Sequence, residues 1–239
     1  MSDSRFPILG ADIPPMLGRI RIMQRLLSNL TKMTPSHISV VGPRYSGKSV
    51  LLKALAQQLQ AGGSPYCAVI LWDLGHQTPQ SDEDFMKLLC RRLGEGICAA
   101  NKDYGEHLLT VESDEYVEIC AVMDALNEDG QKLLMLWDGF DKPLSGGILS
   151  RNLWDNLLDL CRKPSFRLVT STRKELHQLI RDEKSVTSDF WGVFEGVRVG
   201  VFDDDDVEAV LSALSDLKFE SGAKTELINW TSGFPPFLF

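Results

Sequence analysis

The chain lacks the cysteine and histidine spacings that mark disulfide-stapled or metal-binding proteins. Its five cysteines are odd in number and scattered, with no C-x-x-C pair, and its four histidines lie far from one another. Neither a disulfide framework nor a zinc site is therefore expected. Most of the cysteines stand in apolar periodic stretches, so we interpret them as reduced core thiols and expect a cytoplasmic protein.

Long apolar runs and an excess of positive charge are also missing. No apolar run approaches the ~18–20 residues of a membrane span, and residues 1–5 carry no apolar signal-peptide core. We therefore expect no membrane partner. The 25 Lys and Arg against 33 Asp and Glu give a net charge of −8, which argues against a dominant nucleic-acid surface and leaves room for a local basic patch.

One segment, residues 42–49, matches the phosphate-binding pattern G-x-x-x-x-G-K-[ST]. Its glycines let the backbone curl so that successive N–H groups point at one anion. The lysine supplies a charge for the β- and γ-phosphates, and the last serine supplies a hard oxygen for Mg²⁺. The candidate binding residues of this P-loop are Gly42, Pro43, Arg44, Tyr45, Ser46, Gly47, Lys48 and Ser49.

The sequence on either side of the P-loop supports a phosphate site. Residues 37–41 form a short β-rich apolar run directly before it, and residues 47–59 carry a helical pattern directly after it. A strand, a glycine loop and a helix N-terminus together make an anion site from backbone dipoles. The segment therefore predicts binding of ATP or ADP, with Mg²⁺ as the accompanying metal.

Apolar runs alternate with helical patterns along the rest of the chain. These runs are residues 67–72, 133–137, 166–170 and 197–201. Their continuous apolar character is typical of strands buried on both faces. The alternation predicts an α/β fold of three layers, a P-loop NTPase core with a parallel sheet of about five strands. Residues 94–110 are poorly patterned, and we expect a surface insertion there. Four aromatic residues in core-like runs are interpreted as packing residues: Trp72, Trp137, Phe140 and Trp154.

The run 133–137 ends in Asp138-Gly139-Phe140-Asp141. An acidic residue at the carboxyl end of a buried strand lies where open α/β sheets bind ligands. We expect Asp138 to hold Mg²⁺, usually through water, because this ion keeps part of its hydration shell. A complete strand and helix separate the P-loop from Asp138, which predicts a strand inserted between the two motif strands. Asp141 is the candidate that orients or deprotonates the attacking water, with a turn or cap role as its alternative.

The run 166–170 continues into Ser171-Thr172-Arg173. The hydroxyls of residues 170–172 are expected to face the gap between the P-loop and Asp138. Arg173 is positioned to reach a γ-phosphate, where a planar guanidinium stabilises charge spread over phosphoryl oxygens. A solvated arginine at a polar strand end is the alternative.

Together these motifs resemble the STAND class of signal-transduction ATPases, which is allied to the AAA+ and origin-recognition-type ATPases. The resemblance is carried by Met16-Leu17-Gly18-Arg19, the P-loop, the Asp-Gly-x-Asp at 138–141 and the Thr-Ser-Thr-Arg at 170–173. A Gly-Phe-Pro at 233–235 is similar to the Gly-x-Pro of the helical lid in that class. The resemblance spans about residues 16–239 and is most specific at the P-loop.

The resemblance implies roles for residues around the nucleotide: Gly18 and Arg19 near the base or ribose, Asp138 as the Walker B aspartate, Arg173 as sensor 1, and Pro235 against the adenine. The chain departs from the family pattern at Lys142, where many members carry an acidic residue, and no Glu directly follows Asp138. This departure favours slow hydrolysis and a switch over a motor.

We expect residues 1–202 to form the nucleotide-binding domain and residues 203–239 to begin a helical lid. The acidic run 203–206 is interpreted as a helix start favoured by the helix dipole, and the apolar residues 234–239 as a sign that the lid continues further. The predicted function is ATP binding with slow hydrolysis to ADP and phosphate, driving a conformational switch that acts on a protein partner or a second copy. Two alternatives stay open: a non-hydrolysing ATP-gated scaffold, and an AAA+-like loader or remodeller of DNA.

Overall fold

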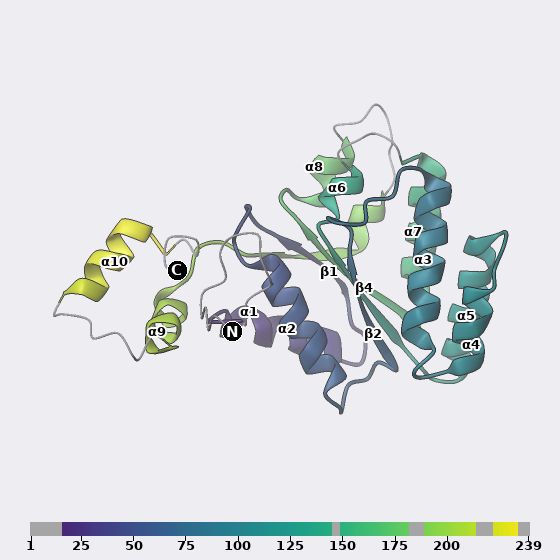
Figure 1. Cartoon of the computed structure of the whole chain (residues 1–239), viewed down its shortest axis with the longest axis horizontal. Helices are drawn as coiled ribbons and strands as arrows, with labels where there is room; N and C mark the ends of the chain where they lie inside the picture. Colours follow the sequence, from purple (N-terminus) through teal and green to yellow (C-terminus); the bar gives the residue numbers. More distant parts are fainter. Residues whose placement is uncertain (1–15, 145–148, 182–188, 214–221, 234–239) are drawn as a thin grey trace, which may run out of the picture.

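The computed structural model describes residues 16–144, 149–181, 189–213 and 222–233. At its centre lies a five-stranded sheet in which every neighbouring pair is parallel, in the order β2-β3-β4-β1-β5 (Figure 1). The strands are β1 His37–Val41, β2 Ala68–Asp73, β3 Leu133–Asp138, β4 Phe166–Thr172 and β5 Phe194–Arg198. The predicted α/β fold class with its parallel sheet is confirmed.

Strand β4 lies between β1 and β3, so it separates the P-loop strand from the strand that ends in Asp138. This is the inserted strand that the sequence predicts. Because all the strands are parallel, their carboxyl ends gather at one edge of the sheet and bring the loops after β1, β3 and β4 together. The sequence predicts the last strand at 197–201, whereas β5 begins three residues earlier because its backbone pairs with β1 from His37 onward.

Helices cover both faces of the sheet (Figure 1). Helices α1 and α2 lie on one face, α3 and α7 lie on the other, and α4 and α5 pack against α3. Helices α9 and α10 lie beside the layered core. The bounds are α1 Ile20–Thr31, α2 Lys48–Gln60, α3 Asp82–Ile97, α4 Lys102–Leu109, α5 Glu115–Glu128, α6 Asp141–Leu144, α7 Arg151–Arg162, α8 Leu176–Arg181, the 3₁₀ helix η1 Asp189–Val193, α9 Asp204–Ala213 and α10 Ala223–Thr231.

The alternation of side chains along the strands divides the core into two parts. On the side of α1 and α2, aliphatic residues such as Ile38 and Val40 pack against the buried leucines of α2. On the side of α3 and α7, aromatic rings lie edge to face or tilted against one another, with centroids from 4.9 to 6.1 Å apart. These rings belong to Trp72, Phe85, Trp137, Phe140 and Trp154. The four aromatic residues interpreted as packing residues are therefore confirmed as core.

The prediction of a surface insertion at 94–110 is wrong. Helix α3 continues to Ile97, and α4 follows with Leu108 only 2% exposed. The glycines that blur the helical pattern are required for close packing. A Cβ on Gly96 would lie 2.3 Å from the Ile70 side chain, and a Cβ on Gly105 would lie 2.4 Å from Cys98 Sγ. Glycine here lets α3 approach the sheet and α4 approach α3.

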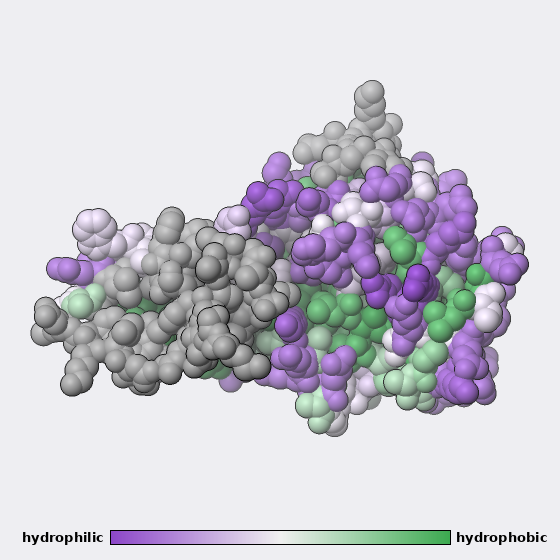
Figure 2. All heavy atoms as spheres, viewed as in Figure 1, coloured by the Kyte–Doolittle hydropathy of each residue, from purple (hydrophilic) through white to green (hydrophobic). Residues whose placement is uncertain are grey.

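The surface of the core is mostly polar on the face that Figure 2 shows. An apolar area lies between α2 and α3, where the edge strand β2 runs, and Leu71 of this strand is 38% exposed. In the described part of the chain no helix has the length and apolarity needed to cross a bilayer.

His37 is a buried polar residue at the start of β1. Its Nδ1 accepts the Leu168 N–H at 3.0 Å, so the ring proton lies on Nε2, which donates to Cys161 O at 2.7 Å. Burial lowers the pKa of His37 to about 4, against the opposing effect of the Cys161 carbonyl, and Arg167 lowers it further. Protonation of Nδ1 would set two donors against each other. The imidazole is therefore neutral in the folded protein.

We predict that His37 makes the fold less stable at pH 5 than at pH 7. The unfolded histidine, with a pKa of 6.5, takes up a proton over this interval, while the folded one stays neutral until about pH 4. This difference removes roughly 2 kcal/mol from the free energy of unfolding at pH 5. His37→Gln keeps a donor and an acceptor but cannot titrate, so urea denaturation at both pH values should show a smaller loss. Identical pH dependence in the two proteins would contradict the assignment.

Candidate nucleotide site

The P-loop leaves β1 through a gap that only glycine fits. The Gly42 N–H donates to Thr172 O at the end of β4, at 3.1 Å. A Cβ on Gly42 would lie 2.2 Å from Val199 O, just after β5, and 2.8 Å from Ser46 Oγ. The start of the loop is therefore fixed against the ends of both strands that flank β1.

The tip of the P-loop, residues 43–47, is open on one side. Pro43, Arg44 and Tyr45 are exposed, and Tyr45 has a left-handed backbone with a φ of +63°. Ser46 is fully buried, yet its Oγ has no hydrogen-bond partner within the described residues. A Cβ on Gly47, whose φ is +88°, would meet no atom within 4 Å. A curled backbone with an orphaned hydroxyl and open space above it fits an anion held by main-chain N–H groups.

Helix α2 begins directly after the tip of the P-loop, and no side chain caps its N-terminus. Its N-cap is Gly47, so no side-chain oxygen accepts from the amides of its first turn. Such amides, at the positive end of the helix dipole, favour an anionic ligand. Lys48 and Ser49, the first two residues of α2, are half-buried beside this helix end.

The Lys48 side chain is folded back onto the loop. Its Nζ donates to Gly42 O at 2.8 Å and to Pro43 O at 2.7 Å. Burial lowers the pKa of Lys48, while the nearby carboxylates of Asp138 and Asp141 oppose that shift. The ammonium group must therefore leave two carbonyl oxygens before it can reach a phosphate.

Asp138 ends β3 beside Ser171 of β4. The Ser171 hydroxyl donates to Asp138 Oδ1 and accepts the Gly139 N–H at 3.0 Å, so it fixes the carboxylate at the sheet edge. Ser171 lies where the sequence predicts a strand-end hydroxyl. Its neighbours Thr170 and Thr172 alternate to the opposite face of the sheet, so the expectation that all three hydroxyls face this gap is wrong for two of them.

Ser49 and Asp138 carry oxygen donors of the kind that Mg²⁺ prefers. Among the described residues no cluster of three or more His, Cys, Asp or Glu side chains could hold a metal ion. Mg²⁺ in phosphate sites is bound by one or two protein oxygens together with phosphate and water oxygens. A hydroxyl and a carboxylate agree with such a donor set, and the roles of Ser49 and Asp138 toward Mg²⁺ stay predictions.

Asp141 and Arg173 form an ion pair across the site, with Arg173 Nε donating to Asp141 Oδ2. The Asp141 side chain is 7% exposed and that of Arg173 is 42% exposed, so the carboxylate lies inside while the guanidinium reaches solvent. Asp141 is also the first residue of the short helix α6. In this arrangement Arg173 is bonded to the Asp141 carboxylate, which the sequence predicts to orient the attacking water molecule.

Arg19 lies behind the P-loop, with its side chain 5% exposed. The guanidinium donates to three carbonyl oxygens: Ser46 O at 3.2 Å, Val201 O at 2.8 Å and Gly200 O at 2.5 Å. It also lies 4.4 Å from the centroid of the Phe202 ring. One side chain thus joins the P-loop to the segment that leads from β5 to α9.

Asp206 of α9 completes the surroundings of Arg19. Its carboxylate accepts the Arg19 backbone N–H and lies 3.7 Å from the guanidinium. A Cβ on Gly18 would lie 3.1 Å from atoms of Asp206, and the φ of Gly18 is +70°. Burial lowers the pKa of Arg19, and the carboxylates of Asp206 and Asp203 oppose the shift. The acidic run 203–206 does begin a helix, as predicted, but Asp206 also has this specific partner.

The structure brings Lys48, Asp138, Asp141 and Arg173 to one edge of the sheet. The nucleotide-contacting roles of Gly18 and Arg19 stay predictions, because the Arg19 guanidinium is bonded here to protein carbonyls. Pro235 lies outside the described residues. Sequence reasoning missed the partners of Arg19, because Asp206 is 187 positions away along the chain.

No protein-family model and no curated protein matches the chain. Solved structures resemble it in fold. The Walker-type ATPase of Pyrococcus abyssi has a TM-score of 0.63 at 17% identity, and the match covers 95% of this chain and 68% of that one. The ORC1 protein of Aeropyrum pernix, in complex with DNA, has a TM-score of 0.59 at 12% identity, covering 96% and 60%. The ORC2 protein of the same organism, in its ADPNP-ADP complexes, has a TM-score of 0.55 at 14% identity, covering 88% and 54%.

These likenesses show that the chain shares its fold with a Walker-type ATPase and with two origin-recognition proteins. Identities of 12% to 17% carry the comparison no further than the fold. The chain spans 68% of the first of these proteins and 60% and 54% of the two others.

We predict that Asp206→Ala destabilises the protein by about 3 kcal/mol, because it leaves a buried guanidinium without its carboxylate. The matched control is Asp205→Ala, on the same helix, whose carboxylate pairs with the exposed Arg21. An exposed pair contributes ~0–1 kcal/mol. Urea denaturation measures both. Equal free energies of unfolding for the two variants would contradict the description of the Arg19 site.

Proposed function

We propose that the described core binds ATP with Mg²⁺ at residues 42–49 and hydrolyses it slowly to ADP and phosphate. The observation that carries this proposal is the uncapped first turn of α2 facing open space above Gly47. Backbone amides in that geometry bind the phosphate tail. A cytoplasmic location, where ATP is abundant, is part of the proposal.

The residues at the carboxyl edge of the sheet have different roles toward the phosphates. Lys48 gives up its two carbonyl partners and takes the β- and γ-phosphate oxygens, which are stronger acceptors because they are ionised. Ser49 and Asp138 would hold Mg²⁺, and the bound ion supplies charge that stabilises the phosphoryl oxygens. Ser171 keeps the Asp138 carboxylate oriented toward that position.

The Asp141–Arg173 pair is the proposed switch. A γ-phosphate competes with the Asp141 carboxylate for the guanidinium of Arg173, because both are oxyanions that accept from its N–H groups. When Arg173 turns to the phosphate, Asp141 is released to orient the attacking water. The site therefore has different contacts with ATP and with ADP, which a nucleotide-dependent switch requires.

Arg19 offers a path from the nucleotide to α9. Its guanidinium bonds Ser46 O inside the P-loop, while its backbone N–H and its charge engage Asp206 of α9. A shift of the P-loop backbone on phosphate binding moves the Ser46 carbonyl oxygen that accepts from the Arg19 guanidinium. Because Arg19 is also bound to Asp206, this shift acts on α9. We assign to this contact the transmission between the nucleotide and the helices after β5.

The likeness to known ATPase structures supports the nucleotide part of the proposal. Membership of the STAND class, and a protein partner or second copy as the responding element, rest on the motifs alone. Lys142 in place of an acidic residue favours slow turnover. The ORC1 protein of Aeropyrum pernix was solved in complex with DNA, but we do not extend DNA binding to this chain because its net charge is −8.

We predict that Lys48→Ala weakens ATP binding about 100-fold, since it removes charged hydrogen bonds to two phosphates. Lys53→Ala is the matched control, because Lys53 lies on the same helix five residues further along. Isothermal titration with ATP and Mg²⁺ gives both affinities. Retained micromolar binding by Lys48→Ala, or equal losses in the two variants, would refute the site.

We predict that Asp141→Asn still binds ATP but slows its hydrolysis by about 100-fold, because an amide cannot take the proton of the attacking water. Single-turnover hydrolysis of radiolabelled ATP measures the rate, with Lys48→Ala as the background. A variant as fast as the natural chain would remove Asp141 from the reaction. A natural chain no faster than background, yet with bound ATP, would favour the non-hydrolysing scaffold.

A further inference from the structure

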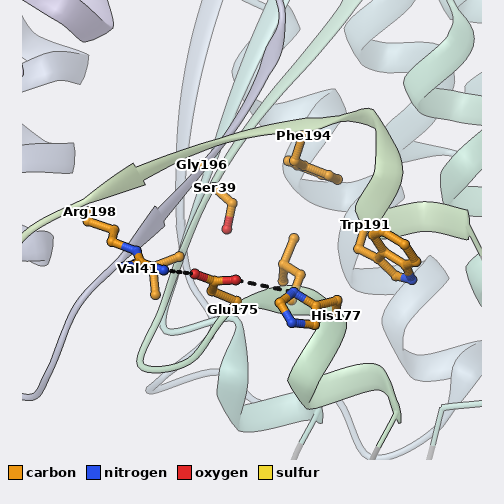
Figure 3. A pocket seen from close by; sticks show the side chains of 9 residues that line it. Ser39, Val41, Glu175, His177, Trp191, Phe194, Gly196 and Arg198 are labelled. Atoms are coloured by element: carbon orange, nitrogen blue, oxygen red, sulfur yellow. Dashed lines mark hydrogen bonds and ion pairs between the residues drawn. The ribbon is translucent and has the colours of Figure 1, made fainter.

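A cavity lies on the face of the sheet opposite to α2. It is formed between β1, β5, α8 and η1 and has a volume of about 330 Å³ (Figure 3). Ser39 and Gly196 form its floor because they alternate with the core residues Val40 and Val197, whose side chains point toward α1 and α2.

The floor of the cavity carries an unused hydroxyl. Ser39 is 5% exposed, lines the cavity, and has no hydrogen-bond partner for its Oγ in the described part of the chain. Figure 3 draws this oxygen pointing away from the strand into the space between Glu175 and Phe194. Thr170, its partner in the β1–β4 register, also has a buried Oγ1 without a partner among the described residues. Buried hydroxyls are normally hydrogen-bonded, and Ser39 is the one of the two that lines the cavity, so its hydroxyl points to a polar occupant there.

Gly196 provides the room above the floor. It lies within β5, and a Cβ built there would meet no atom within 4 Å. Its φ lies outside the left-handed region, so the backbone does not require glycine. Glycine in a strand interior costs stability and often marks a site where another group approaches closely. The missing side chain leaves an open volume beside Ser39.

The walls of the cavity are aromatic at one end and charged at the other (Figure 3). Trp191 and Phe194 provide the rings. At the opposite end Glu175 accepts from Arg198 and lies 3.3 Å from His177 Nδ1. The Glu175 carboxylate and the Arg198 guanidinium compensate each other's charge. The walls suit an uncharged molecule with an apolar ring and a polar edge.

We propose that this cavity is a binding site for a small neutral aromatic molecule that carries a hydroxyl or another hydrogen-bonding group. The ring packs between Trp191 and Phe194 over Gly196, and the polar group bonds Ser39 Oγ. A volume of about 330 Å³ accommodates one ring with a substituent. This site is independent of the proposed nucleotide chemistry.

Phenol and toluene are matched probes, because they differ only in one hydroxyl against a methyl group. Their binding is followed by the NMR shift of the Trp191 indole N–H, which Trp191→Phe identifies. We expect phenol to bind with a dissociation constant on the order of 1 mM and about fivefold more tightly than toluene, as one hydrogen bond allows. Ser39→Ala should remove that preference, and Gly196→Val should abolish binding of both.

The melting temperature without any probe distinguishes whether the Ser39 hydroxyl serves to bind a ligand or to stabilise the fold. A hydroxyl that bonds within the protein stabilises the fold, so Ser165→Ala, which loses a 2.6 Å bond to Met123 O, should lower the melting temperature. Ser39→Ala should leave the melting temperature unchanged or raise it. Equal affinities for phenol and toluene, no shift of the Trp191 signal, or phenol binding that survives Gly196→Val would each overturn the proposal.

Discussion

The passage of the chain through Gly42 is the constraint on which the rest of the site depends. The backbone at this residue is held by Thr172 O on one side and faces Val199 O on the other, with no space for a side chain. Because β4 and β5 flank β1, the P-loop begins at a fixed point relative to both neighbouring strand ends. The same β4 carries Ser171 and leads to Arg173, so the loop, the Asp138 carboxylate and the arginine are positioned by one piece of sheet.

A buried guanidinium adds a second constraint behind the loop. Taking a charge out of water costs several kcal/mol unless it is paired and hydrogen-bonded. Arg19 has three carbonyl acceptors, a carboxylate and an aromatic ring around it, drawn from the P-loop and from the chain after β5. Any movement that separates those parts must break several of these contacts together. Such an arrangement favours discrete positions of α9 over gradual drift.

The sequence predicts the parts of this molecule whose causes are local. The P-loop is contiguous, and buried parallel strands are continuous apolar runs, so the fold class and the order of the motif strands follow from the chain itself. Features that depend on a partner far along the chain cannot be predicted in this way. Asp206 stands in a run of four aspartates that helix chemistry already explains, and only the fold brings it to Arg19. Glycines near 94–105 suggested a loop because a glycine for close packing and a glycine for a turn look alike in sequence. The cavity over Gly196 depends on the register of β1 and β5, which no local pattern encodes.

The proposed nucleotide site depends on contact between the Lys48 ammonium group and the phosphate tail of ATP. An acyl-phosphate derivative of ATP measures this directly, because it transfers its acyl group to a lysine amine beside the bound phosphates, and peptide mass spectrometry locates the modified residue. We expect acylation at Lys48 in the natural chain, suppressed by an excess of ATP with Mg²⁺. Acylation spread over other lysines such as Lys53 and Lys174, unaffected by ATP and absent from Lys48, would contradict this contact.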